Sequence, residues 1–208
     1  MENNNEQATL RQDIYLLLAS LFRQPPSQEL VAFLAELEIE TSESAMQKAW
    51  FALQQAAQNS DREALEDEYQ NLFIGIGRGE AVLFGSWHMT GSLMEKPLAD
   101  IRHDLKLLGI EREEEVKEPE DHISALCEVM AMLTEEEFGL QQAFFNKHIA
   151  PWYEPFSQQV EAANSANFYR SVAMLLRAFG SLEQVQFSEN TKSKPHLKID
   201  VKNVTEYE

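Results

Sequence analysis

The periodicity of the apolar residues is the feature that most limits how this chain can fold. Apolar residues recur three and four positions apart along most of the sequence, as Leu10, Ile14 and Leu17 do near its start. This spacing places apolar side chains on one face of an α-helix, whereas a half-buried strand needs strict alternation. Alternation is seen only between Leu197 and Val201, where a strand would still need a partner. The sequence therefore predicts an all-α protein.

Turn residues and capping residues divide this pattern into separate helices. Pro25 and Pro26 should end the first helix, and Ser27 can cap the second. Gly109 should end a later helix, because glycine readily adopts the left-handed conformation found at such ends. The helices predicted in this way cover residues 10–21, 30–37, 42–53, 61–73, 98–108, 118–133, 140–148, 152–162 and 165–187.

The length and the charge pattern indicate one helical domain and a separate tail. A chain of 208 residues can bury about 70% of its unfolded surface in a single core. Residues 188–208 contain four acidic residues and four lysines, so residues 1–187 carry the whole excess of negative charge. We expect residues 1–187 to form a single globular helical bundle and residues 188–208 to be flexible.

The strong negative charge excludes several classes of function. The chain has 35 Asp and Glu against 17 Lys and Arg, which gives a net charge of -18. Such a surface repels the phosphates of nucleic acids and the anionic headgroups of a membrane. An acidic disordered chain is also excluded, because 44% of the residues are hydrophobic. The charge leads us to expect a basic partner.

Three features favour the cytoplasm. The single cysteine, Cys127, cannot form an intrachain disulfide, as expected of a reducing compartment. Residues 1–9 lack the basic and apolar regions of a secretory signal. The longest stretch without charge, residues 81–94, is too short and too polar to span a bilayer, which takes about 20 apolar residues.

No metal, cofactor or catalytic site is predicted. A di-iron site in a helical bundle uses a glutamate three residues before a histidine, and none of the five histidines has one. Cys127 lies within a predicted apolar helix, where cysteine is usually inert. Ser86 lacks the glycines of a nucleophile elbow. The sequence therefore offers no residue to which a reaction could be assigned.

The uncharged segment 81–94 is the first of two candidate recognition features. Leu83, Phe84, Trp87 and Met89 cluster in it, although loops are normally polar and exposed. Such a segment either folds back onto the core or forms part of a binding groove. The sequence leaves both alternatives open.

The run from Glu118 to His122 is the second candidate. As a structural element it predicts the start of a helix, with Glu118 as the cap, Pro119 at the first position and Asp121 in the first turn. As a recognition element it places polar side chains beside the apolar face that holds Leu126. That arrangement would suit a peptide with both basic and apolar residues.

Several segments join this run in an order that matches a known family of proteins. The most specific is Glu118-Pro119-Glu120-Asp121-His122-Ile123, followed by Leu126 and Met130. The others are Tyr69–Phe73, Gly85–His88, Phe144–Trp152 and Phe168–Tyr169. Together they resemble the TorD/DmsD/NarJ family of redox-enzyme maturation chaperones, and most closely its TorD branch, over roughly residues 10–187. The chain departs from the family at Gly85, where Glu is usual, and at His88, where Tyr is usual.

This resemblance implies an all-α chaperone that is not an enzyme and needs no cofactor or metal of its own. Such chaperones bind the twin-arginine signal peptide, and often the body, of a molybdenum-cofactor oxidoreductase precursor. The client would be a precursor such as that of trimethylamine N-oxide reductase or dimethyl sulfoxide reductase. The chaperones assist cofactor insertion and delay export. Some members form domain-swapped dimers, so the resemblance implies a monomer or a swapped homodimer, with a hinge near residues 111–120.

We therefore predict a peptide-binding site made of acidic and apolar side chains. Its acids would bind paired arginines through charge-assisted hydrogen bonds, and its apolar residues would receive the rest of the signal. His122 would tune the site by titrating near neutral pH. The predicted site residues are Phe84, Trp87, His88, Glu118, Glu120, Asp121, His122, Leu126 and Met130.

Two other classes of function compete with this prediction. A small helical enzyme acting on a cationic or nucleotide substrate would need a polar pocket with perturbed titrating groups. A structural adaptor, such as an oligomerisation bundle, would need a long and uninterrupted heptad repeat. The sequence shows neither pattern.

Overall fold

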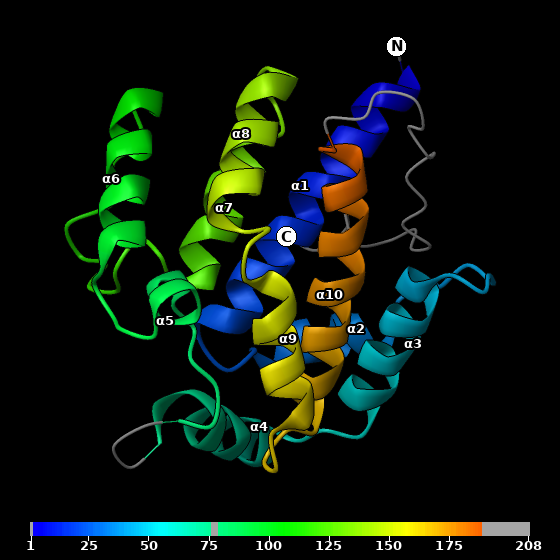
Figure 1. Cartoon of the computed structure of the whole chain (residues 1–208). Helices are drawn as coiled ribbons and strands as arrows, with labels where there is room; N and C mark the ends of the chain where they lie inside the picture. Colours follow the sequence, from blue (N-terminus) through cyan, green and yellow to red (C-terminus); the bar gives the residue numbers. More distant parts are fainter. Residues whose placement is uncertain (1, 76–78, 189–208) are drawn as a thin grey trace.

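The computed structural model confirms the all-α class (Figure 1). It describes residues 2–75 and 79–188, and within these ranges the chain forms no strand, only an isolated bridge between Phe84 and His122. The helices are α1 (Glu2–Arg23), α2 (Gln28–Ala35), α3 (Ala45–Gln58), α4 (Arg62–Tyr69), the π-helix η1 (Gln70–Ile74), α5 (Gly85–Thr90), α6 (Lys96–Leu108), α7 (Ile123–Leu133), α8 (Phe138–His148), α9 (Tyr153–Ala162) and α10 (Phe168–Gln186).

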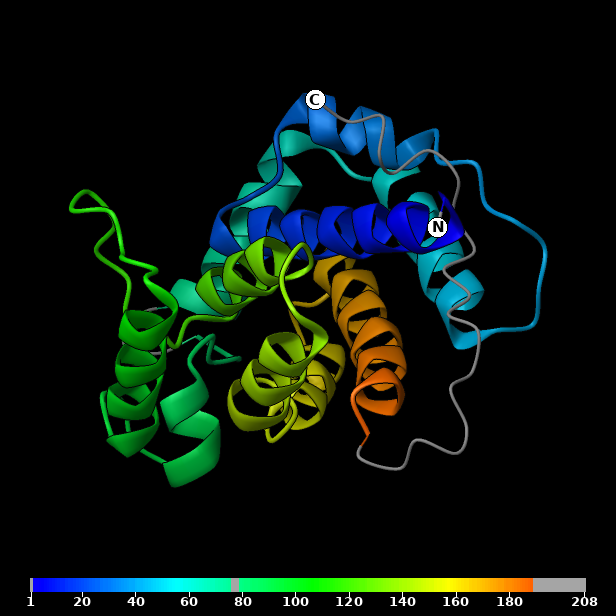
Figure 2. The same cartoon turned by 90° about the horizontal axis from the view of Figure 1, so that it is seen from above.

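Two long helices organise the core. The α1 helix packs along α7, and α10 packs against both α3 and α9. The α2 helix lies beside α3, and α5 lies beside α6. Figure 2 shows α6 at the margin of the molecule, with the segment that follows it extending away from the other helices. One apolar cluster joins the central helices and includes Ile14, Leu18, Phe22, Met130 and Phe179.

Several predicted helix boundaries are confirmed, because local side chains set them. The Ser27 side chain accepts a hydrogen bond from the Leu30 N–H and caps α2. The Asp61 side chain accepts from the Ala64 N–H and caps α4. Gly109 ends α6 with a φ of 70°, in the left-handed region that favours glycine.

Three local predictions are corrected by the structure. The α3 helix begins after the cap Ser44, slightly later than predicted. Residues 85–90, which were predicted to be part of a loop, form α5. The α7 helix begins at Ile123 rather than at Pro119, because the residues between them form a turn in which the His122 N–H donates to the Pro119 carbonyl oxygen (3.1 Å).

A buried polar cluster joins α1, α8 and α10. The Arg11 guanidinium donates to both carboxylate oxygens of Glu183 at 2.8 and 2.7 Å, and to the Gln141 side-chain oxygen at 2.9 Å. The Tyr15 hydroxyl donates to the same carboxylate at 2.7 Å. Glu183 is fully buried, so its charge depends on these partners. Side chains far apart in the sequence therefore fix how these three helices pack.

A second long-range interaction sets the start of α10. The Glu68 carboxylate, from α4, accepts hydrogen bonds from the backbone N–H groups of Asn167 (2.8 Å), Phe168 (3.0 Å) and Tyr169 (2.7 Å). These are the N–H groups that the first turn of a helix leaves without an internal partner. The cap of α10 thus comes from a different helix, which the sequence did not predict.

The structure tests the remaining predictions about the organisation of the chain only in part. The predicted tail lies outside the described residues from position 189 onward, as does the alternation between Leu197 and Val201. The predicted hinge, residues 111–120, falls in the segment between α6 and α7, and exchange between two copies stays a prediction. Among the described helices, none combines the length and the hydrophobicity that crossing a bilayer requires.

Candidate functional site

A groove of about 530 Å³ opens between α1, α7 and the segment that joins α6 to α7. We call it the acidic groove. Its apolar lining consists of Leu16, Leu105, Ile110, Val116, Ala125, Val129 and Met132. Its polar lining consists of Arg23, Glu111, Arg112, Glu113, Glu118, Glu120, His122, Ser124 and Glu128. Three of the predicted site residues, Glu118, Glu120 and His122, are among them.

The floor of the acidic groove is a second apolar face of α7. Ala125, Val129 and Met132 are spaced by four and three residues, which puts them on one side of the helix. Met132 is 55% exposed, and Leu16 of α1, which also lines the groove, is 47% exposed. Large apolar side chains exposed beside buried ones are typical of a surface that takes an apolar ligand.

The charge of the acidic groove is predominantly negative. Five glutamates and two arginines line it. His122 adds no positive charge at neutral pH, because burial lowers its pKa to about 4. A cationic group that enters the groove therefore meets an excess of carboxylates beside an apolar floor. This combination favours a ligand that is both basic and apolar.

The two arginines of the acidic groove already bind acidic or carbonyl groups within it. The Arg23 guanidinium, at the end of α1, lies 2.6 Å from the Glu128 carboxylate. Arg112 donates from Nη1 to the Glu118 carbonyl oxygen at 3.1 Å, and its Nε lies 3.9 Å from the Glu120 carboxylate. Oxygen atoms of the groove lining thus already hold the guanidinium groups of these two arginines.

The predicted acids Glu118 and Glu120 lie where an incoming basic group can reach them. Both belong to the segment between α6 and α7 that walls the acidic groove. Glu118 is exposed. The Glu120 side chain is 14% exposed and accepts a hydrogen bond from the Arg102 Nε of α6 at 2.9 Å. The structure therefore brings these two predicted residues together in one site.

The prediction that His122 titrates near neutral pH is wrong for this structure. Its side chain is buried, and this burial lowers its pKa to about 4, more than the nearby Glu118 charge raises it. Its Nδ1 accepts a hydrogen bond from the Ser124 N–H at 3.1 Å, so the neutral ring caps α7. His122 lines the groove as a neutral capping residue, a position that was predicted for Glu118.

Asp121 is buried and serves the fold. Its carboxylate accepts hydrogen bonds from the Ser86 N–H at 2.8 Å and from the Ser86 hydroxyl. Its carbonyl oxygen accepts from the Gly85 N–H at 2.9 Å, and the Ile123 N–H donates to the Leu83 carbonyl oxygen at 2.9 Å. These bonds tie the start of α5 to the start of α7, and we call this contact the junction. Asp121 does not line the acidic groove.

Phe84, Trp87 and His88 also lie outside the lining of the acidic groove. The Phe84 ring meets the His122 ring edge-on, with centroids 5.2 Å apart. The His88 ring stacks on the Trp152 ring at 5.2 Å and 15°. Each of the three predicted side chains is partly buried. The structure supports folding back onto the core for the first part of the segment, with Leu83 and Phe84, whereas Met89 near its end is 42% exposed.

The departure from the family at Gly85 has a structural reason. A Cβ atom at this position would lie 2.9 Å from Nε1 of Trp152, well inside ordinary contact distance. The Trp152 indole is itself held by a hydrogen bond from Nε1 to the His148 carbonyl oxygen at 2.6 Å. A larger residue at position 85 would therefore require the indole to move.

Leu126 and Met130 are fully buried core residues and present no surface to a ligand in this structure. The prediction had assigned the core face of α7 to the peptide. A sequence signal for a second apolar face does exist, because Ala125 and Met132 are apolar but fall outside the core cluster. A helix that is apolar beyond one stripe needs a second apolar contact or a ligand.

Comparison with known proteins identifies the family. Residues 40–158 match the nitrate reductase delta subunit family, and this match spans more than half of the chain. It begins before α3, ends within α9 and includes the junction and most of the acidic groove. The chain belongs to this family.

Individual relatives place the chain on the TorD branch. The chaperone protein TorD of Vibrio atlanticus is 28% identical over 204 residues, which cover 86% of this chain and 94% of that protein. TorD of Actinobacillus succinogenes is 26% identical and covers 72% of this chain and 78% of its own. A candidate Tat proofreading chaperone, DmsD, from Haemophilus influenzae is 25% identical, with coverage of 76% and 74%. These relatives are named as chaperones, which agrees with the expectation of a protein that is not an enzyme.

A solved structure shows the same fold. The crystal structure of a candidate redox enzyme maturation protein from Archaeoglobus fulgidus superimposes with a TM-score of 0.55. Its sequence is 21% identical, and the alignment covers 84% of this chain and 93% of that one. This likeness supports the helical architecture on which the acidic groove depends.

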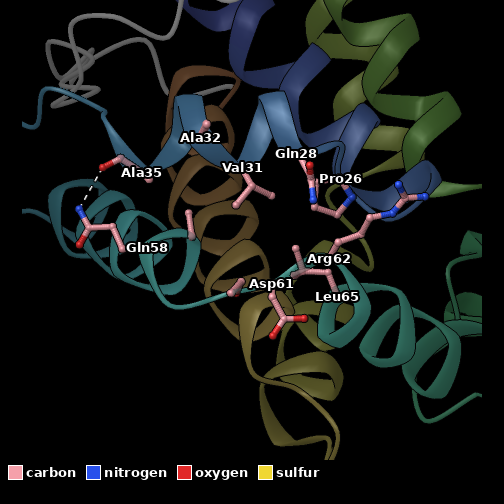
Figure 3. Close-up of a pocket in the computed structure, with 11 residues that line it drawn as sticks. Pro26, Gln28, Val31, Ala32, Ala35, Gln58, Asp61, Arg62 and Leu65 are labelled. Carbon is pink, nitrogen blue, oxygen red and sulfur yellow. Dashed lines mark hydrogen bonds between the residues drawn. The ribbon is translucent and has the colours of Figure 1, made fainter.

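A second hollow, of about 520 Å³, lies between α2, α3 and the start of α4 (Figure 3). Val31, Ala32 and Ala35 of α2 form its upper wall, and Gln58 closes one side by donating to the Ala35 carbonyl oxygen at 2.9 Å. Its charged lining is balanced, with one acid and one base. Because this hollow lacks the charge bias of the acidic groove, it is the weaker candidate for a basic ligand.

The alternative of a small enzyme gains no support from the part of the chain that the structure describes. In residues 2–75 and 79–188, no three His, Cys, Asp or Glu side chains gather where they could hold a metal ion. Cys127 is buried, and burial raises the pKa of its thiol, which keeps it protonated and unreactive.

Proposed function

We propose that this chain is a client-specific chaperone for the precursor of a molybdenum-cofactor oxidoreductase. It would bind the twin-arginine signal peptide and part of the body of that precursor in the cytoplasm. Binding would keep the precursor competent for cofactor insertion and delay its export. The client would be a reductase such as trimethylamine N-oxide or dimethyl sulfoxide reductase. The names of the TorD and DmsD relatives support the class of function.

The observation that carries the proposal is the pairing of carboxylates with apolar side chains in one groove. Glu118 and Glu120 offer carboxylates to the paired arginines, whose planar guanidinium groups can bind them with two hydrogen bonds. The apolar residues that follow the arginines would lie along Val129 and Met132. Long-range attraction from the net charge of -18 would speed the encounter and make it sensitive to salt.

A titration of the full chain with a synthetic peptide tests the proposal. The peptide carries Arg-Arg followed by an apolar run, and its partner carries Lys-Lys in the same place. We expect the Arg-Arg peptide to bind at least about tenfold more tightly, because lysine cannot form the two-pronged hydrogen bonds. Equal affinities, or binding of neither peptide, would reject the proposed recognition of a twin-arginine signal.

A pair of matched variants locates the binding surface. Met132→Gln removes an exposed apolar side chain from the floor of the acidic groove. Leu107→Gln removes one from α6, where the side chain is 73% exposed and does not line the groove. We expect only Met132→Gln to weaken peptide binding. If the two variants bind alike while the peptide still binds the wild type, the signal peptide uses another surface.

A further inference from the structure

We propose that Arg112 is an internal ligand of the acidic groove, which an arginine of the bound partner displaces. Displacement would release the segment 111–118, which Arg112 closes in the free protein. This inference rests on the proposed function, because it needs a partner that brings arginine to this groove. It goes beyond that function by adding an autoinhibitory contact and a conformational response to binding.

The contacts of Arg112 close its own segment. Its Nη1 donates to the Glu118 carbonyl oxygen at 3.1 Å, six residues further along the chain. Its Nε lies 3.9 Å from the Glu120 carboxylate. Of these two acceptors, the Glu120 carboxylate is also among the groups proposed for the incoming arginines. A partner guanidinium and the Arg112 guanidinium therefore compete for the Glu120 carboxylate.

The other arginine of the acidic groove is held more firmly. Arg23 ends α1, and its guanidinium binds the Glu128 carboxylate at 2.6 Å and the Ser124 hydroxyl at 3.1 Å, both on α7. Moving Arg23 away would break both of these contacts between α1 and α7. Arg112 instead belongs to a segment without a helix, where the Val116 N–H donates to the Glu113 carbonyl oxygen in a local turn.

A third arginine explains why Glu120 stays in position when Arg112 leaves. The Arg102 Nε, on α6, donates to the Glu120 carboxylate at 2.9 Å and does not line the acidic groove. The Glu120 carboxylate is thus oriented from the helix behind it, and its other oxygen faces Arg112. At that oxygen the Arg112 guanidinium lies 3.9 Å away, too far for a hydrogen bond, so a partner guanidinium that approaches more closely would replace a weak ion pair by a charge-assisted hydrogen bond.

The size of the effect follows from the exposure of the contact. The Arg112 side chain is 38% exposed, so its ion pair is of the screened kind that contributes little to stability. Removing this competitor should tighten binding of an arginine peptide by about two- to fivefold. The released segment should also lose the protection of its backbone amides against hydrogen exchange.

The experiment compares Arg112→Ala with Arg177→Ala in the full chain. Arg177 makes an ion pair with Glu161 at 2.8 Å, and its side chain is 43% exposed. Removing it therefore changes the net charge as Arg112→Ala does, at a side chain of similar exposure that does not line the groove. Each variant is titrated with the Arg-Arg peptide described above. Hydrogen exchange of residues 111–118 is measured with and without the peptide. Arg112→Lys is added, because it keeps the local charge but cannot reproduce the planar guanidinium contacts.

The expected result has three parts. Arg112→Ala binds the peptide more tightly than Arg177→Ala does, and Arg112→Lys also gains affinity. In the free protein, residues 111–118 exchange faster in Arg112→Ala than in wild type. In wild type, the peptide makes these residues exchange faster, even though it covers the groove.

Two outcomes would overturn the inference in different ways. If wild type binds the peptide but residues 111–118 become slower to exchange, the segment closes over the ligand, and Arg112 is not displaced. If exchange in the free Arg112→Ala variant equals that of wild type, Arg112 does not close the segment, whatever the peptide does. If no variant binds the peptide, the proposed function fails first, and the competition inferred from it fails as well.

Discussion

The junction and the acidic groove share one short run of sequence, Glu118 to His122, but use its two halves differently. Glu118 and Glu120 wall the groove on a segment without a helix, where Glu118 is exposed and the two arginines paired with Glu120 are 52% and 38% exposed. Asp121 and His122 are buried, and they join the start of α5 to the start of α7. Neighbouring polar residues therefore differ in what they do because they differ in burial.

This difference separates effects on stability from effects on binding. A buried carboxylate or imidazole is matched to fixed partners, so changing it leaves those partners without hydrogen bonds. An exposed glutamate exchanges its protein contacts for water at little cost. Variants in the junction should therefore lower the free energy of unfolding, and variants in the groove wall should alter peptide affinity.

The largest expected effect is that of Asp121→Ala. The substitution removes a carboxylate that accepts two hydrogen bonds from Ser86, one of them at 2.8 Å. Because hydrogen bonds to a charged group contribute about 1.5 to 3 kcal/mol each, the free energy of unfolding should fall by about 3 to 6 kcal/mol. Urea unfolding measures this loss.

The control for that variant is Asp61→Ala, which removes the exposed cap of α4. Its expected loss is about 1 kcal/mol. If Asp121→Ala were no more destabilising than Asp61→Ala, the junction would not hold α5 and α7 together as described. A variant that kept full stability but lost peptide binding would return Asp121 to its predicted role in recognition.

The second effect is a dependence of stability on pH that arises from His122. Its pKa is lowered from 6.5 to about 4 by burial, so the unfolded chain takes up a proton at a higher pH than the folded chain. Stability should therefore fall as the pH drops from about 6.5 to about 4, by up to about 3 kcal/mol from this residue. His148, whose pKa burial also lowers, contributes in the same direction.

The variant His122→Asn isolates the contribution of His122. Asparagine keeps an acceptor at the cap of α7 but does not titrate. The difference in unfolding free energy between wild type and variant, followed from pH 7 to pH 4 by urea unfolding, should shrink as the pH falls. A constant difference would mean that His122 is not buried as a neutral ring.

The third effect concerns the close approach of α5 to Trp152. Gly85→Ala would place a Cβ atom 2.9 Å from Nε1 and 3.0 Å from Cε2 of the indole, and this overpacking should cost about 1 to 3 kcal/mol. Gly139→Ala is the control, because a Cβ atom there meets no other atom within 4 Å. In the α8 helix that change should leave stability unchanged or raise it by less than about 1 kcal/mol. Thermal unfolding of the two variants compares the effects.

The sequence predicts the features that depend on interactions between neighbouring residues, and it does not predict those that depend on residues far apart in the chain. The caps at Ser27 and Asp61 and the end of α6 at Gly109 were predicted, because each depends on residues within one turn. The cap of α10 was not, because Glu68 supplies it from another helix. His122 replaces Glu118 as the cap of α7 for a similar reason, since a contact with segment 81–88 fixes where that helix begins.

The predicted site shows the same limit. The sequence indicated that acids and apolar side chains would adjoin, and the structure places Glu118 and Glu120 beside such a floor. The apolar residues of α7 extend to a second face that holds Met132, but which of the two faces stays open depends on how α1 covers the helix. Leu126 and Met130 were therefore chosen from the covered face.

The smallest effect on stability, and the one that most sharpens the contrast with the junction, is that of Glu118→Gln. This substitution keeps the shape of an exposed side chain and removes its charge, so the unfolding free energy should change by less than about 0.5 kcal/mol. Affinity for the Arg-Arg peptide should fall by about two- to fivefold at low salt, and the loss should shrink as salt screens the groove. Glu43→Gln, an exposed acid that does not line the groove, makes the same change in net charge and should leave affinity as it is. Equal losses in the two variants would mean that the peptide responds only to the overall charge, and the acidic groove would then have no special part in holding the arginines.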